Sequence, residues 1–182
     1  MVEASPPPAA DRRVGSMVGL FWISGDEVYL GTPPTPEGAG VLLSPAGVRI
    51  TGDAPREWRW SDVMDLQVTD APVRSALTRW AARALSVAAA ALDAWVPDGP
   101  PEMTVVITTA EGDRVETPVF SGAATAYTER EVDISLGLLA RFTRGESSPA
   151  VLTHWWNEVR PGEVLRSRDR EAVLEGWLAT SH

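Results

Sequence analysis

The spacing of apolar residues changes along this chain of 182 residues, and those changes limit the folds that it can adopt. Up to about residue 68, apolar and polar positions tend to alternate, which is typical of half-buried strands. A helical spacing follows over about 71–96. Strand character returns over 103–109 and 114–120, and helical spacing dominates from residue 128 onward. Strands, an inserted helix, a further hairpin and then helices indicate an α+β fold rather than an alternating α/β one.

Turn residues divide the first strands. Ser24-Gly25-Asp26 separates the apolar run 18–23 from residues 27–30. The turn at 44–47 separates two further short strands, and we expect Gly47 to supply the positive φ that this turn requires.

The two-residue period also predicts which side chains share a face. Trp58 and Trp60 are expected on one side of their strand, and Met64, Leu66 and Val68 on the buried side of the next. Pro118 cannot donate a ladder hydrogen bond, so it predicts an edge or the end of a strand.

Helix ends are marked in the C-terminal part. Thr128 and Glu131 form a capping box, and Gly145 is placed to end that helix. Ser148-Pro149 predicts the start of a second helix, whose apolar positions Val151, Leu152, Trp155, Trp156 and Val159 are expected inward. Ser167 opens a third.

The composition excludes several kinds of chemistry. All 16 basic residues are Arg, and there is no Cys. A chain without Lys cannot form a Schiff base or a Walker-type phosphate loop. A chain without Cys has no thiol nucleophile, disulfide or thiolate metal site. With only two His, one of them His182, we expect no metal and no cofactor.

The charge argues against two classes of partner. The formal net charge is −9, so the summed field opposes nucleic acid and anionic membranes. The longest apolar-rich stretch, 84–92, is too short to span a bilayer, and the N-terminus lacks the apolar core of a signal peptide. We therefore expect a cytoplasmic protein that binds neither nucleic acid nor membrane.

The predicted organisation has three parts. Residues 1–16 form a flexible tail rich in Pro and Ala, and 17–145 form a β-rich domain with the inserted helix at about 71–96. Residues 146–182 form a C-terminal helical extension.

The hairpin over 40–51, the segment Trp58-Arg59-Trp60-Ser61-Asp62-Val63 and the strand 66–68 together resemble bacterial pleckstrin-homology-like (GRAM-like) domains. The chain is also similar in layout to uncharacterised proteins of GC-rich bacteria. The resemblance covers about residues 17–145. It implies a bent antiparallel sheet or partly open barrel, plugged by the helix that starts at Thr128. The inserted helix departs from this pattern, and so does the acidic loop at 24–27, where lipid-binding members carry Lys and Arg.

The eight Trp residues are the positive signal for function. Trp155 and Trp156 are adjacent on a helix, so their side chains diverge by about 100°. Either both pack inside the molecule, or one covers the helix of Trp177 and the other faces a partner. The candidate interface is Trp155, Trp156, Trp177, Arg79 and Arg83.

His154 is the one internal histidine that a general-base mechanism would use, with Glu158 one helical turn away. An ordinary exposed helix histidine explains the same pattern. The sequence therefore predicts a non-enzymatic protein-interaction or scaffold module that binds a protein partner or itself. The alternative is a small-molecule-binding protein or enzyme with a pocket between the sheet and the inserted helix.

Overall fold

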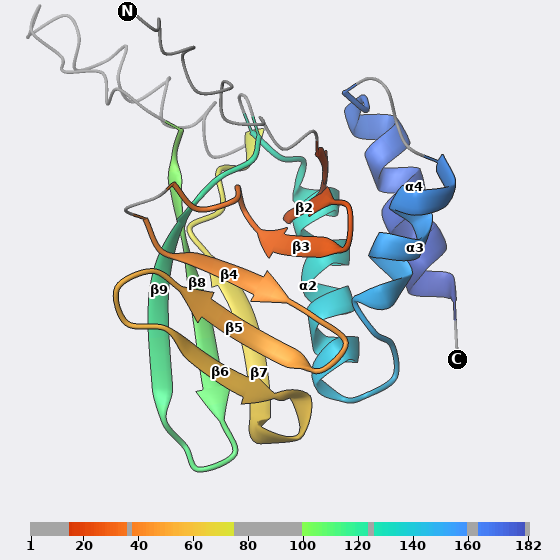
Figure 1. Cartoon of the computed structure of the whole chain (residues 1–182). Coiled ribbons are helices and arrows are strands. Elements are labelled where there is room, and N and C mark those ends of the chain that lie inside the picture. Colours follow the sequence, from red (N-terminus) through yellow and green to blue (C-terminus); the bar gives the residue numbers. More distant parts are fainter. Residues whose placement is uncertain (1–14, 36–37, 75–99, 124–125, 160–163, 181–182) are drawn as a thin grey trace, which may run out of the picture.

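The structure, a computed structural model, describes residues 15–35, 38–74, 100–123, 126–159 and 164–180. These residues form two antiparallel sheets and three helices, which confirms the α+β class and the partly open sheet (Figure 1). The six-stranded sheet follows chain order through β1 (Ser16–Val18), β2 (Phe21–Ser24), β3 (Glu27–Leu30), β4 (Gly40–Leu43), β5 (Gly47–Thr51) and β6 (Arg56–Arg59).

A single 3₁₀ turn, η1 (Trp60–Asp62), leads into the second sheet. This sheet consists of β7 (Val63–Thr69), β8 (Glu102–Thr109) and β9 (Arg114–Phe120). The helices are α2 (Glu129–Thr143), α3 (Ala150–Val159) and α4 (Ser167–Ala179). Figure 1 shows α3 and α4 on one flank of the molecule, with α2 between them and the second sheet.

The apolar run 18–23 is not one strand, because the chain reverses at Gly19. Gly19 has a φ of 58°, and Val18 pairs with Phe21 in the β1–β2 hairpin. The Leu20 N–H donates to Ser135 Oγ of α2 at 3.2 Å. A Cβ on residue 19 would lie 2.3 Å from the same oxygen. Glycine is therefore required here both for the turn and for the close approach of α2.

Glycine is required at position 47, but the predicted reason, a positive φ, is wrong. Gly47 is not among the glycines of positive φ. It is needed instead because a Cβ would lie 1.9 Å from the carbonyl oxygen of Trp58 on β6. The turn itself is closed by a pair of backbone hydrogen bonds between Ser44 and Gly47.

The predicted burial of Met64 is also wrong. The β7–β8 pairing shifts register between Val63 and Asp65, which is the signature of a β-bulge. The extra residue moves Met64 outward, where its exposed fraction is 66%, while Val63, Leu66 and Val68 remain buried.

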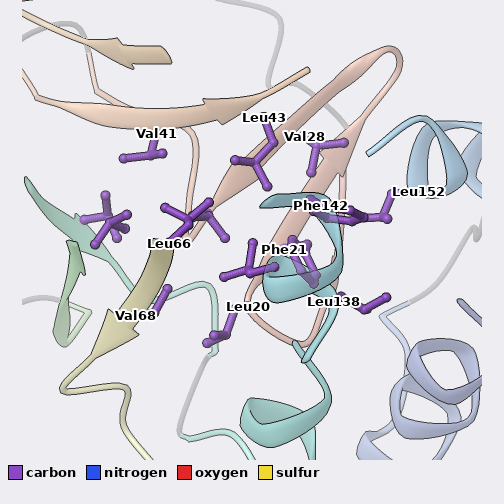
Figure 2. Close-up of a cluster of buried hydrophobic side chains, with 14 of the residues drawn as sticks. Leu20, Phe21, Val28, Val41, Leu43, Leu66, Val68, Leu138, Phe142 and Leu152 are labelled. Carbon is purple, nitrogen blue, oxygen red and sulfur yellow. The ribbon is translucent and has the colours of Figure 1, made fainter. Parts of the chain in front are cut away.

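The hydrophobic core lies between the two sheets and α2. Figure 2 shows Phe21, Val28 and Leu43 of the first sheet facing Leu66 of β7 and Phe142 of α2. The Phe142 ring is 6.4 Å from Phe21 and 6.0 Å from Trp60, measured between ring centroids. Trp58 and Trp60 both pack partly against this core, although β6 ends at Arg59 and Trp60 lies in η1 rather than on the predicted strand.

The ends of α2 are as predicted. Thr128 Oγ1 accepts from the Glu131 N–H at 3.0 Å, and Glu131 Oε2 accepts from the Thr128 N–H at 2.7 Å. At the other end Gly145 has a φ of 68°, and its N–H donates to the Phe142 carbonyl. The Glu146 N–H donates to the Arg141 carbonyl, which completes a Schellman motif.

Candidate functional site

Helix α3 is apolar in sequence but incompletely buried. It begins after Pro149, with the Ser148 Oγ accepting from the Ala150 N–H at 3.3 Å. Only Leu152 is fully buried, in contact with the core. Val159, expected inward, has an exposed fraction of 55%. The five apolar positions span an arc of about 140° on the helix, and the rest of the described structure covers only part of that arc.

Trp155 lies against Trp177 of α4. The ring centroids are 5.5 Å apart and the planes meet at 81°, an edge-to-face arrangement. Trp177 has an exposed fraction of 5%, whereas Trp155 is half-buried. Trp155 therefore helps to cover Trp177, and Trp177 joins α4 to the core rather than presenting a surface.

Trp156 is half-buried as well, and it touches the edge of the core. Val159 follows Trp156 by three residues and Trp155 by four, so the three side chains are neighbours on the helix. We call Trp155, Trp156 and Val159 the α3 surface. The helix contacts β2 and β3, and its buried residue Leu152 lies on the same arc, between Trp155 and Trp156.

His154 lies beside Glu158, as the spacing predicts. Its Nε2 lies 3.2 Å from Glu158 Oε1, and both side chains are largely exposed to solvent. An exposed pair of this kind contributes little to stability.

A buried polar network holds α4 against α2 and so positions Trp177. Arg170 Nε donates to Oε1 of Glu131, a fully buried carboxylate. Arg170 Nη1 also donates to the Leu165 carbonyl at 2.7 Å. The Thr128 hydroxyl, besides capping α2, donates to Glu171 Oε1 at 2.6 Å. The sequence prediction missed this network, although Arg170 stands in the same helical row as Leu174 and Trp177.

Tyr127 anchors the residues that precede the insertion. Its backbone exchanges hydrogen bonds with Pro72 and Arg74, and its hydroxyl accepts from the Gly122 N–H at 3.0 Å. The ring is fully buried. Burial raises the pKa of the Tyr127 hydroxyl above its ordinary value.

Arg79 and Arg83 lie outside the residues that the structure describes, and so does most of the predicted inserted helix. The pocket expected beside that helix is therefore not described either. A different hollow, of about 190 Å³, lies between the β3–β4 connection and β9. Its walls include Pro33, Pro34, Val119 and Phe120.

In the described ranges no three His, Cys, Asp or Glu side chains gather closely enough to bind a metal ion. Nor does any helix in the described ranges have the length and apolar character needed to cross a bilayer.

Comparison of the chain with protein-family models, with curated proteins and with solved structures found no match.

Proposed function

We propose that this chain is a non-enzymatic protein-interaction module that docks a protein partner, in the simplest case a second copy of itself, through the α3 surface. The observation that carries the proposal is the partial exposure of Trp155 and Trp156 beside the exposed Val159 on one short helix. Aromatic residues are enriched among the anchors of protein interfaces. Leaving two adjacent Trp partly in water forgoes burial energy that a partner surface would recover.

We also propose that the β-rich part is a pleckstrin-homology-like domain. Two antiparallel sheets, with α2 packed against β7 and filling the core between them, support this proposal. Domains of this family have about seven strands, whereas the two sheets of the described residues have six and three. The loop at Ser24–Glu27 is acidic, which favours a protein ligand over an anionic lipid.

The hollow at Pro33 and Phe120 does not support a second function. Its volume of about 190 Å³ is below the range of roughly 300–1,000 Å³ that is usual for small-molecule sites.

Sedimentation analysis of the purified chain over a range of concentrations tests the α3 surface. We expect self-association that Trp156→Ala weakens at least about tenfold, because truncating a buried anchor commonly costs 2 kcal/mol or more. Met64→Ala is the matched control, since Met64 is the exposed apolar residue of the distant β7 bulge. A chain that stays monomeric, and that binds no protein in a Trp156-dependent manner, would contradict the proposal.

A further inference from the structure

The arginines of the described residues are mostly paired. Ion pairs join Arg114 to Glu116, Arg130 to Glu175, Arg141 and Arg144 to Glu146, Arg168 to Asp169, and Arg170 to Glu131. Arg74 donates to Ser167 at 2.8 Å. Among the described arginines, Arg49, Arg56, Arg59 and Arg166 have no such partner. Three of these four lie on the β5–β6 hairpin, where all three are exposed.

Strand β6 is an edge of the six-stranded sheet. Among the described strands it pairs only with β5, and Figure 1 shows it at the margin of that sheet. The register places Trp58 opposite Val48 and Arg56 opposite Ile50. The backbone N–H of Trp60 also donates to the Ala46 carbonyl, at 3.4 Å.

The direction of the backbone groups on β6 follows from these bonds. Backbone groups alternate between the two sides of a strand, so those of Arg56 and Trp58 point toward β5. Those of Glu57 and Arg59 then point away from β5, along the edge. The edge therefore offers two N–H donors and two carbonyl acceptors, flanked by arginine side chains.

Strand β9, at an edge of the other sheet, is protected in a way that β6 is not. The Phe120 carbonyl accepts from the Thr32 N–H at 2.8 Å, from outside the sheet. Pro118 lies two residues earlier, so it faces the same side and has no N–H to offer there. Proline on an edge strand prevents further pairing. Strand β6 contains no proline and is exposed along most of its length.

We propose that β6 accepts an acidic, extended segment of a partner protein as an added strand. The positive charge of the β5–β6 hairpin is the reason for proposing an acidic partner segment. In a chain of net charge −9, the hairpin 47–59 carries Arg49, Arg56 and Arg59 against Asp53 and Glu57. An extended segment with acidic side chains would pair its backbone with Glu57 and Arg59. Its carboxylates would reach Arg59 on one face of the sheet and Arg56 on the other, because side chains alternate between the faces of a strand. This surface is separate from the α3 surface and does not depend on it.

The test uses a fluorescein-labelled peptide of eight residues, Thr-Glu-Glu-Thr-Thr-Glu-Glu-Thr, which carries Glu on both faces of an extended strand, and measures anisotropy with the full chain. One comparison peptide has Gln in place of Glu, and a second has Pro at two central positions. We expect the acidic peptide to bind, and the other two to bind at least about tenfold more weakly. Arg56→Gln with Arg59→Gln should lower its affinity at least about tenfold. Arg166→Gln with Arg168→Gln, which removes the same charge elsewhere, should change it less than about twofold.

Three results would overturn the proposal: no binding of the acidic peptide at millimolar concentration, equal binding of the Pro peptide, or equal loss in the two arginine variants. Binding of anionic vesicles through Arg56 and Arg59, without peptide binding, would overturn it as well. Melting curves of both double variants show whether the fold is intact. The acidic peptide should bind Trp156→Ala as tightly as the original chain, which separates this surface from the one proposed for self-association.

Discussion

Arg170 of α4 and Glu131 of α2 form a buried ion pair, in which the guanidinium Nε donates to carboxylate Oε1. The second oxygen of Glu131 accepts from the Thr128 N–H. The carboxylate is thus fully engaged inside the protein. A buried ion pair adds little to the free energy of unfolding compared with a well-packed apolar pair. Removing one partner, however, leaves the other charge buried and uncompensated.

Arg170→Met should therefore lower the free energy of unfolding by about 3 to 5 kcal/mol. Urea denaturation followed by circular dichroism measures the loss. The double variant Arg170→Met, Glu131→Gln should lose less than Arg170→Met alone, because the amide carries no charge and can still accept from the Thr128 N–H. A single variant within about 1 kcal/mol of the original chain would contradict this prediction.

Thr128→Ala should cost about 1 to 2 kcal/mol, because it removes the cap of α2 together with the hydrogen bond to Glu171. Thr153→Ala is the control: its hydroxyl donates only to the Ala150 carbonyl on the exposed side of α3. We expect the control to lie within about 0.5 kcal/mol of the original chain. Equal losses in the two variants would argue that the capping box is not a stabilising feature.

Gly47→Ala and Gly176→Ala should change stability in opposite directions. At position 47 the new Cβ meets the Trp58 carbonyl at 1.9 Å, so β5 and β6 must separate. We expect a loss of about 2 kcal/mol or more. At position 176, in α4, nothing lies within 4 Å of the new Cβ. There, the better helix propensity of Ala should add about 0.5 to 1 kcal/mol. Thermal melting of both variants shows whether each substitution raises or lowers stability.

The chain should lose stability at high pH through Tyr127. Its folded-state pKa is raised by burial, so the neutral hydroxyl is favoured in the folded protein. The stabilisation is complete below the unfolded-state pKa of about 10 and is lost as the pH rises through the higher folded value. Because the chain has two Tyr and no Lys, few other groups titrate in this window.

Tyr127→Phe is the control for this pH dependence. It should be less stable at pH 7, because the Gly122 N–H loses its acceptor, but its stability should fall less between pH 9 and pH 11. Denaturant midpoints over that range measure the difference. Parallel curves for the two proteins would assign the alkaline loss to another group.

Local patterns predicted much of the fold correctly. The hairpins, the capping box at Thr128 and the helix stop at Gly145 are each encoded within a few neighbouring residues. The errors occur where distant segments meet. Gly19 looks like one position in an apolar run until Ser135 of α2 approaches it. Met64 follows the alternation of its strand until the pairing with β8 inserts a bulge.

The candidate surface was predicted less completely. Adjacent Trp residues identified α3, because their side chains diverge by about 100° and one of the two interpretations placed one of them against a partner. The burial of Trp177 depends on how α4 docks, and that docking is determined by Glu131 and Arg170, which are 39 residues apart in sequence. The free edge of β6 was not predicted either, because a hairpin motif does not indicate which strand will be last in its sheet.

The double role of Glu131 also links the opening motions of two helices. If the first turn of α2 frays, the carboxylate leaves both the Thr128 N–H and Arg170, and the first turn of α4 loses its buried ion pair with α2. These two segments should therefore open as one cooperative unit. Their backbone amides should exchange with deuterium at the same rate, rather than each helix end fraying independently.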